Sequence, residues 1–276
     1  MTHPFSPLIQ PQELLELQHS KNLILVDASN GKDAYANYQR QHLDKALFVD
    51  LNTELADIKE DVTDGGRHPL PTIEQFSKTL SRLGISKESH VVVYDDKMGA
   101  NAAARFWWML KAVGHEKVQV LDGGFQEAER VGFPINSKVV STTPTTYFIE
   151  DWKLPLATMD EVEAVVQDTH HIVIDVRDSE RYRGEKEPID LIAGHIPGAI
   201  NIPFTENLTK NGVFLSSEKL KEKYLNVFNS ISSDKIIVHC GSGVTACHTL
   251  LAIATAGLDI PKLYVGSWSE WSRNKM

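Results

Sequence analysis

The same order of sequence signals occurs twice along this chain of 276 residues. In each copy an apolar run ends in aspartate, a histidine follows, a second apolar run leads to a polar loop, and a glycine-containing turn comes last. The pairs are residues 24–27 and 172–175, His42 and His195, residues 91–95 and 236–240, and residues 121–124 and 264–267, separated by 148, 153, 145 and 143 positions. Such nearly constant separations indicate two tandem copies of one domain, so both halves must adopt the same architecture.

Within each copy, continuous apolar runs alternate with longer amphipathic segments. A strand covered on both faces of a parallel sheet consists of such a continuous run. The predicted strands are residues 23–26, 91–94, 118–121, 172–174, 236–238 and 263–265. Thr72 and Thr158 each stand three residues before a glutamine or a glutamate, as in a capping box, and predict helices over residues 73–83 and 159–166. This alternation predicts an α/β fold with a mainly parallel sheet flanked by helices in each copy.

A polar segment separates the two copies. Residues 137–146 end in the sequence STTPTT and contain few apolar residues, as is typical of a linker. We therefore expect a first domain over residues 1–136, a linker over residues 137–155 and a second domain over residues 156–276.

The composition limits the partners of the chain. With 28 Lys and Arg against 37 Asp and Glu, the net charge is −9, which disfavours binding to nucleic acid or to an anionic membrane surface. No apolar run approaches the ~18 residues that a membrane-spanning helix needs. The first residues lack the basic and apolar regions of a secretory signal. Only two cysteines occur, which excludes a disulfide framework, and we expect a cytoplasmic protein.

The chemistry is expected to lie in residues 236–247, whose sequence is IIVHCGSGVTAC. A buried strand ends before Cys240, two glycines follow, and a helix over residues 248–256 comes next. Cys240 is therefore expected at the carboxyl end of a strand, where open α/β sheets bind their ligands. Glycines let successive backbone N–H groups point inward, and the helix N-terminus adds a partial positive charge. This setting favours a thiolate and makes Cys240 a candidate nucleophile, with an ordinary buried cysteine as the alternative.

Other uses of this loop fit its residues less well. A cysteine phosphatase or arsenate reductase needs an arginine six residues after the cysteine to grip the oxyanion, and that position is Ala246. Acyl transfer needs a histidine and an asparagine elsewhere in the chain, which the sequence leaves open. Zinc binding by the histidines and cysteines at positions 239, 240, 247 and 248 lacks the short spacings of structural zinc sites. Cys247 is interpreted as a core residue, or alternatively as a resolving thiol.

Five segments resemble motifs of the two-domain rhodanese-type sulfurtransferases. Residues 240–246, CGSGVTA, resemble the active-site loop of that family, and of its mercaptopyruvate branch in particular. The other segments are GGRHPLP at 65–71, LDGG at 121–124, GHIPGAIN at 194–201 and GSWSEW at 266–271. The resemblance covers essentially the whole chain. It implies two tandem rhodanese-like domains, of which the second is catalytic, and transfer of a sulfane sulfur through a persulfide on Cys240.

The resemblance also implies roles for particular side chains. Arg181 matches an arginine that binds the carboxylate of the sulfur donor, a group that a planar guanidinium suits. Ser242 and His68 match the serine and the histidine of a relay that protonates the leaving thiol, while Asn52 stands in place of its aspartate. A second arginine of the mercaptopyruvate branch is replaced by Ile189. Further donor contacts are implied for the loop residues Gly241, Gly243, Val244 and Thr245.

The first copy carries a carboxylate, Asp95, at the position of Cys240, so we expect it to be a non-catalytic scaffold. These features predict a sulfurtransferase that moves sulfur from 3-mercaptopyruvate to cyanide, a small thiol or a thioredoxin-like protein, without a metal or an organic cofactor. A thiosulfate:cyanide sulfurtransferase that uses the same persulfide is the alternative. A persulfide-carrying binding module that turns over slowly also stays open.

Overall fold

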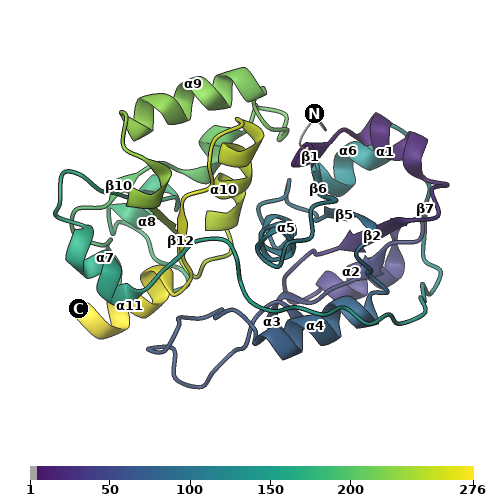
Figure 1. Cartoon of the computed structure of the whole chain (residues 1–276), viewed down its shortest axis with the longest axis horizontal. Coiled ribbons are helices and arrows are strands. Elements are labelled where there is room, and N and C mark those ends of the chain that lie inside the picture. Colours follow the sequence, from purple (N-terminus) through teal and green to yellow (C-terminus); the bar gives the residue numbers. More distant parts are fainter. Residues whose placement is uncertain (1–4) are drawn as a thin grey trace. The chain divides into compact units, whose positions relative to one another are not determined.

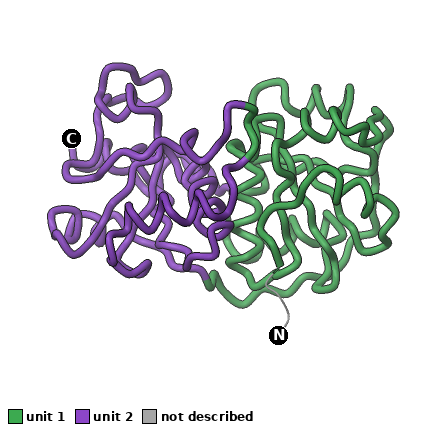
Figure 2. The backbone as a smooth tube through the Cα atoms, turned by 90° about the horizontal axis from the view of Figure 1, so that it is seen from above, with its two compact units in different colours: residues 1–55, 71–153, 211–213 green, residues 56–70, 154–210, 214–276 purple. Residues whose placement is uncertain are grey.

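The computed structural model describes residues 5–276, which form two compact units. Unit 1 comprises the chain up to Leu55 together with Pro71–Lys153 and Asn211–Val213, and unit 2 comprises Ala56–Leu70, Leu154–Lys210 and Phe214–Met276. Figure 2 colours the two units separately. Each unit has its own sheet and its own helices (Figure 1), which confirms the prediction of two α/β domains with mainly parallel sheets.

Unit 1 is built on a parallel sheet of five strands. In spatial order these are β1 (Leu8–Ile9), β6 (Val118–Leu121), β5 (His90–Tyr94), β2 (Leu23–Asp27) and β4 (Leu47–Phe48). Val91, Val92 and Val93 of β5 are fully buried, as expected for a strand that is covered on both faces of its sheet. A separate antiparallel pair joins β3 (His42–Leu43) to β7 (Ile135–Asn136).

The helices of unit 1 follow the amphipathic segments of the sequence. They are α1 (Pro11–Leu17), α2 (Ala34–Arg40), α3 (Leu51–Glu54), α4 (Ile73–Arg82), α5 (Ala103–Ala112) and α6 (Gly124–Arg130). The predicted capping box starts α4, since Thr72 Oγ1 accepts the N–H of Gln75 at 3.1 Å and Gln75 Oε1 accepts the N–H of Thr72 at 2.7 Å. Phe106, Trp107 and Trp108 of α5 are buried in the core.

Unit 2 repeats this plan. Its parallel sheet contains, in spatial order, β10 (Ile200–Asn201), β9 (Ile172–Asp175), β11 (Ile236–His239), β12 (Lys262–Tyr264) and β8 (Leu156–Ala157). Its helices are α7 (Met159–Val165), α8 (Ser179–Tyr182), α9 (Ser217–Phe228), α10 (Ala246–Thr255) and α11 (Ser267–Lys275), with 3₁₀ turns at Phe204–Asn207 and Ser233–Lys235. Thr158 caps α7 as predicted, because its hydroxyl accepts the N–H of Glu161 at 3.2 Å. Among residues 5–276, no helix combines the length and the apolar character that crossing a membrane requires.

The two sheets have the same strand order when strands are counted within each unit. β2, β5 and β6 of unit 1 correspond to β9, β11 and β12 of unit 2. Asp27 is paired with Tyr94 in the first sheet, and Asp175 is paired with His239 in the second. Because equivalent residues occupy equivalent places in the two sheets, the surroundings of matching positions can be compared directly.

The polar segment after β7 packs on unit 1, which extends to Lys153. The backbone N–H of Thr145 donates a hydrogen bond to the carbonyl of Ser81 at 3.0 Å. Tyr147 is buried although the sequence around it is polar. Residues 137–153 of the segment that we expected to be a linker are therefore part of unit 1.

Residues 56–70 follow the first part of unit 1 in the sequence but belong to unit 2. The backbone N–H of Gly65 donates to Glu270 Oε1 at 2.8 Å. The backbone N–H of Arg67 donates to Ser269 Oγ at 3.0 Å. Through these contacts with α11, the segment brings the GGRHPLP motif into the unit that contains Cys240.

In unit 1 the loop that corresponds to the cysteine loop is filled by its own carboxylate. Asp95 Oδ1 accepts hydrogen bonds from the backbone N–H groups of Lys97 at 2.9 Å and Gly99 at 2.8 Å. Asp95 Oδ2 accepts the N–H groups of Asn101 at 3.0 Å and Ala103 at 3.2 Å. A side chain of the chain itself thus occupies the place where an anion would bind at the end of β5.

Replacing Asp95 with alanine is expected to destabilise unit 1. The substitution leaves these inward-facing N–H donors without their acceptor, and we expect the free energy of unfolding to fall by about 3 kcal/mol or more, since one unsatisfied buried donor costs roughly 1–3 kcal/mol. Chemical denaturation measures this change. Asp33→Ala is the control, because Asp33 is exposed and its side chain caps no helix. Equal midpoints for the two variants would contradict the assignment of the carboxylate as the organiser of this loop.

Candidate active site

The segment after β11 forms a tight loop between this strand and α10. β11 ends at His239 and α10 begins at Ala246, so Cys240 lies at the carboxyl end of a central strand, as predicted. Its side chain is buried and forms no disulfide. Gly243 has a φ of +72°, and a Cβ at this position would lie 2.7 Å from the carbonyl oxygen of Val265. The second glycine of the loop is therefore required by the close approach of the neighbouring turn.

Ser267, at the start of α11, holds the cysteine loop through its hydroxyl group. Ser267 Oγ accepts hydrogen bonds from the backbone N–H of Cys240 at 3.1 Å and of Gly243 at 3.0 Å. It donates to the carbonyl oxygen of Tyr264 at 2.8 Å. The sequence motifs did not identify this serine as functional, although it lies in the GSWSEW segment.

The backbone at the beginning of α11 supports the same loop. The N–H of Trp268 donates to the carbonyl oxygen of Cys240 at 3.1 Å, and the N–H of Ser269 donates to that of Gly241 at 2.9 Å. The loop conformation is thus fixed by hydrogen bonds from a neighbouring helix.

The four loop residues expected to contact the donor, Gly241, Gly243, Val244 and Thr245, lie in this one turn. The N–H of Gly243 is already taken by Ser267. In the described part of the chain, no backbone hydrogen bond occupies the N–H groups of Gly241, Ser242, Val244 and Thr245. These N–H groups are the loop donors that an anionic or carbonyl oxygen could use.

Ser242 and His68 lie together, although 174 positions separate them in the sequence. His68 Nδ1 is 2.7 Å from Ser242 Oγ, and the serine is buried. His68 reaches this place because residues 56–70 belong to unit 2. Asn52, by contrast, belongs to α3 of unit 1.

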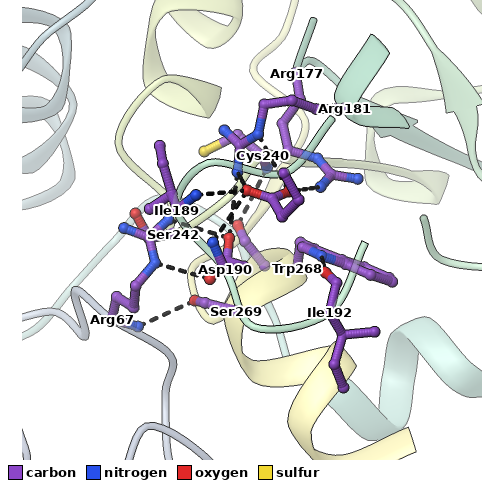
Figure 3. Close-up of polar contacts among 12 residues, drawn as sticks. Arg67, Arg177, Arg181, Ile189, Asp190, Ile192, Cys240, Ser242, Trp268 and Ser269 are labelled. Atoms are coloured by element: carbon purple, nitrogen blue, oxygen red, sulfur yellow. Dashed lines mark hydrogen bonds and ion pairs between the residues drawn. The ribbon is translucent and has the colours of Figure 1, made fainter. Parts of the chain in front are cut away.

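Two arginine side chains approach the loop at Gly241. A Cβ at this position would lie 2.9 Å from Nη2 of Arg67 and 3.5 Å from Nη2 of Arg181. Figure 3 shows both arginines beside the loop that carries Cys240. Arg181 was predicted as a donor-binding residue. The sequence motifs did not assign a role to Arg67, which is the immediate neighbour of His68.

A buried carboxylate, Asp190, holds these arginines in place. Asp190 Oδ1 accepts a hydrogen bond from Nε of Arg67 at 2.9 Å, and Oδ2 accepts one from Nη2 of Arg181 at 3.3 Å (Figure 3). Arg273 Nη1 of α11 lies 3.4 Å from Oδ1. The side chain of Asp190 is fully buried, so these charge-assisted contacts fix the guanidinium groups next to the loop.

Glu187 fixes Arg181 from a second side. Its Oε1 accepts hydrogen bonds from Nη2 of Arg181 at 2.7 Å and from the backbone N–H groups of Ile189 at 3.1 Å and Asp190 at 3.0 Å. Burial of Glu187 disfavours its charged form, but these hydrogen bonds outweigh burial and hold its pKa below the usual value. The side chain of Ile189 is exposed, so the position of the second family arginine supplies no charge to the loop.

Arg177 is buried, and its contacts connect structural elements of unit 2. Its Nη2 donates to Asp175 Oδ2 at 2.6 Å and to the carbonyl oxygen of Gly194 at 2.7 Å. Its guanidinium lies over the ring of Trp268, 5.0 Å from the centroid. Arg177 is thus enclosed by a carboxylate, a carbonyl and an aromatic face.

The charges around the cysteine leave an excess of positive charge. The cluster contains four arginines, Arg67, Arg177, Arg181 and Arg273, and three carboxylates, Asp175, Glu187 and Asp190. Within this ion-paired group, the arginines thus outnumber the carboxylates by one. His239 adds no charge at neutral pH, because its complete burial lowers its pKa below the usual value. The site is suited to a monoanionic ligand.

Cys247, the second cysteine, lies in the helix that follows the loop. Its Sγ donates to the carbonyl oxygen of Gly243 at 3.3 Å, and the residue is fully buried in α10. Within residues 5–276, no group of three His, Cys, Asp or Glu side chains is arranged to hold a metal ion. Cys240 thus remains the candidate nucleophile of the loop.

Comparison with known proteins shows which family has this arrangement. The family model described as the rhodanese-like domain matches the chain over residues 10–130 and again over residues 158–274. The two matches lie one in each half of the sequence, as the repeat predicted.

Individual relatives include proteins named for two different sulfur donors. The 3-mercaptopyruvate sulfurtransferase of Mus musculus is 35% identical over 279 residues, which cover 97% of this chain and 92% of the mouse protein. The thiosulfate sulfurtransferase of Rattus norvegicus is 34% identical over 260 residues, covering 91% of this chain and 86% of the rat protein. The solved structure of 3-mercaptopyruvate sulfurtransferase from Leishmania major has a TM-score of 0.85 and 30% identity, covering 99% of this chain and 75% of that one.

Proposed function

The chain belongs to the rhodanese family, and we propose that it is an enzyme that transfers sulfur from 3-mercaptopyruvate to a nucleophilic acceptor through a persulfide on Cys240. The observation that carries this proposal is the setting of Cys240. A buried thiol lies at the end of a central strand, in a loop with available N–H donors and two guanidinium groups at Gly241. Such a setting places hydrogen-bond donors and positive charge where an anionic donor would meet the sulfur nucleophile.

In the first half-reaction the Cys240 thiolate attacks the sulfur of 3-mercaptopyruvate. A sulfur–sulfur bond forms and the carbon–sulfur bond of the donor breaks. The electron pair of the broken bond passes to the carbon, so that the leaving group is the enolate of pyruvate. The enzyme keeps the sulfur as a persulfide on Cys240.

The leaving enolate must take up one proton to become pyruvate. Ser242 Oγ and His68 Nδ1, 2.7 Å apart, form a pair that can orient and deliver a proton next to the loop. A positioned donor of this kind contributes typically 10²–10⁴-fold to a rate. The pair is proposed to protonate the leaving enolate in the donor half-reaction, while Cys240 alone carries the transferred sulfur.

In the second half-reaction a nucleophile attacks the outer sulfur. Cyanide, a small thiol or a thioredoxin-like protein forms a new bond to this sulfur, and the sulfur–sulfur bond breaks to return the Cys240 thiolate. Sulfur passes as a neutral atom from the donor to Cys240 and then to the acceptor, so the full cycle returns the enzyme to its starting state and requires no external oxidant or reductant. With only two cysteines in the chain, we propose that the enzyme acts in the reducing cytoplasm.

The donor is proposed from the charge of the site. 3-Mercaptopyruvate offers one carboxylate for a guanidinium fork and one carbonyl for the loop N–H donors. Arg181 and Arg67 both lie at Gly241, so Arg67 supplies the second guanidinium that Ile189 does not. Thiosulfate, a compact dianion, is the second candidate, since relatives of similar identity are named for it. A phosphatase or arsenate reductase lacks support because Ala246 provides no arginine at the position those enzymes need.

Steady-state kinetics with both donors and cyanide test the proposal. We expect a higher kcat/KM for 3-mercaptopyruvate than for thiosulfate, and repeated turnover separates an enzyme from a binding module that is modified once. In the double variant Gly241→Arg with Ser242→Lys, the kcat/KM ratio should shift toward thiosulfate, because each added cation favours the dianion. The new side chain at position 241 also displaces Arg67, whose Nη2 would lie 2.9 Å from its Cβ.

The control for this graft carries the same residues on the exposed face of α9, as Leu225→Arg with Asn226→Lys. Its donor ratio should equal that of the wild type, because distant surface charges are screened by salt. A wild-type enzyme that prefers thiosulfate would contradict the charge argument for the donor.

A further inference from the structure

Unit 1 contains a cavity of about 590 Å³ beside the end of β2. Asp27, the last residue of β2, lines it together with Ser29, Gln41 and Phe125. All of its lining residues belong to unit 1. Its volume lies within the range of roughly 300–1,000 Å³ that is typical of small-molecule sites. None of these residues takes part in the chemistry proposed for Cys240.

The lining residues can be matched one by one with residues of unit 2. Asp27 occupies in its sheet the place of Asp175, since the strand partners of these residues correspond. The position two residues after each aspartate is Ser29 in unit 1 and Arg177 in unit 2. The backbone N–H groups of both residues donate to their aspartate, at 2.8 Å for Ser29 and 3.0 Å for Arg177.

The aromatic residues of the two sites also correspond. The N–H of Phe125 donates to the carbonyl oxygen of Asp95 at 3.0 Å. In unit 2 the N–H of Trp268 donates to the carbonyl oxygen of Cys240 at 3.1 Å, and Cys240 is the counterpart of Asp95. Phe125 therefore takes the place of Trp268 at the start of the last helix of its unit.

Gln41, the residue that follows α2, also has a counterpart in unit 2. His42 Nδ1 lies 2.7 Å from the carbonyl oxygen of Tyr38, and His195 Nδ1 lies 2.8 Å from that of Tyr182. The two histidine and tyrosine rings stack in both units, with centroids 4.2 Å and 3.9 Å apart. The residue before each histidine, Gln41 in unit 1 and Gly194 in unit 2, is thus equivalent by position.

In unit 2 these three equivalent positions enclose one guanidinium group. Arg177 is bonded to the carboxylate of Asp175 and to the carbonyl of Gly194, and it lies over the ring of Trp268. In unit 1 the carboxylate and an aromatic ring are kept, but the arginine is replaced by Ser29. The cavity in unit 1 is lined by Asp27, Gln41 and Phe125, the counterparts of the residues that hold the guanidinium in unit 2.

The charges of the cavity support a cationic occupant. Asp27 is only 4% exposed, and it forms no ion pair with a lysine or an arginine among the described residues. Asp96 and Glu129 add two further carboxylates to the lining, against the single cation Arg40. A buried carboxylate without a cation favours the binding of one, because its charge is poorly solvated.

We propose that this cavity of unit 1 binds the guanidinium group of a small organic cation, with Asp27 as its carboxylate partner and Phe125 as its aromatic face. Arg177 in unit 2 shows the contacts that such a group would make: a bidentate carboxylate, a backbone carbonyl and a cation–π contact. Because the cavity is larger than one guanidinium, a ligand with a second amino group can also reach Asp96 or Glu129. This proposal is independent of the donor and of the persulfide proposed above.

Isothermal titration calorimetry of the full chain tests the proposal with four probes. Agmatine carries a guanidinium and an amine, L-arginine carries a guanidinium on an amino acid, and N-acetyl-L-arginine amide represents an arginine side chain within a peptide. L-Citrulline is the neutral control of nearly the same shape as L-arginine. We expect agmatine to bind, and L-citrulline to bind at least about tenfold more weakly than L-arginine, since the loss of one charge-assisted pair changes affinity by this order. Tighter binding of agmatine than of N-acetyl-L-arginine amide would support a free small molecule as the occupant, and the reverse order would overturn that assignment in favour of an arginine side chain of a protein.

Two variants locate the binding. Ser29→Arg gives unit 1 the arginine that unit 2 has at the equivalent position, Arg177. The new guanidinium should fill the site and abolish agmatine binding, while kcat/KM for sulfur transfer stays at the wild-type value. Asp27→Asn removes the charge at constant size and should weaken binding by about tenfold or more. Asp33→Ala, an exposed aspartate outside the cavity lining, serves as the control and should bind agmatine like the wild type. Equal binding of L-arginine and L-citrulline, unchanged affinity in both cavity variants, or no binding of any guanidinium would overturn the proposal.

Discussion

Replacing Cys240 with serine is expected to reduce sulfur transfer to the rate of the reaction without enzyme. A serine hydroxyl at this place is neither ionised at neutral pH nor able to carry a sulfane sulfur, so both half-reactions lose their intermediate. The measurement is steady-state turnover with 3-mercaptopyruvate and cyanide. Far-UV circular dichroism of the variant should match the wild type, because the thiol is replaced by a side chain of similar size.

Cys247→Ser is the matched control for this variant. Cys247, the second cysteine of the chain, lies in α10, and its thiol donates a hydrogen bond to the carbonyl oxygen of Gly243 in the loop. We expect this variant to retain most of its turnover. Substantial turnover in Cys240→Ser would contradict the role of Cys240 as the nucleophile. Loss of activity in Cys247→Ser alone would contradict it as well and would point to Cys247.

Removal of either arginine at the loop is expected to lower kcat/KM for 3-mercaptopyruvate by about ten- to a hundredfold. Each substitution, Arg181→Ala or Arg67→Ala, removes one charge-assisted contact that we propose for the donor carboxylate, and such a contact is worth roughly 1.5–3 kcal/mol. We expect a loss of kcat/KM for Arg67→Ala because the guanidinium of Arg67 lies next to Gly241 and is held there by its ion pair with Asp190. Steady-state kinetics of each single variant measure the effect.

The rate of alkylation by iodoacetamide distinguishes donor binding from damage to the nucleophile. In both arginine variants Cys240 should still be alkylated at a rate similar to that of the wild type. Arg183→Ala is the control, because Arg183 is exposed and pairs only with the neighbouring Glu185 among the described residues. An unchanged kcat/KM in Arg181→Ala and Arg67→Ala would make both residues parts of the scaffold.

The fold could be predicted because its signals are local. Continuous apolar runs marked the central strands to within one or two residues, and Thr72 and Thr158 marked the starts of α4 and α7. The helix after the cysteine begins at Ala246, two residues earlier than expected, since the apolar pattern alone does not show where the loop ends.

Part of the candidate site could be predicted in the same way, and part could not. Cys240 and Arg181 belong to motifs that are continuous in sequence. Arg67 and Asp190 stand 123 positions apart, and their ion pair depends on residues 56–70 belonging to unit 2. No periodicity or short motif encodes such a pairing, because it is set by the packing of α11 against a distant segment.

Ser267 shows a second reason why sequence alone is insufficient. Its hydroxyl binds the N–H groups of Cys240 and Gly243, and its backbone φ is +55°, an uncommon value for a serine. Serine is frequent on protein surfaces, so its identity carries little information. Only the structure shows that this hydroxyl organises the cysteine loop.

Mass spectrometry of the protein after treatment with 3-mercaptopyruvate, in the absence of any acceptor, tests the persulfide most directly. We predict that the tryptic peptide containing Cys240 gains the mass of one sulfur atom, and that addition of cyanide removes it with release of thiocyanate. Trypsin leaves Cys240 and Cys247 on one peptide, so a second protease that cleaves between them is used to assign the added mass to one cysteine. A donor-treated enzyme that turns over but carries no added sulfur on Cys240, or carries it on Cys247, would contradict the account.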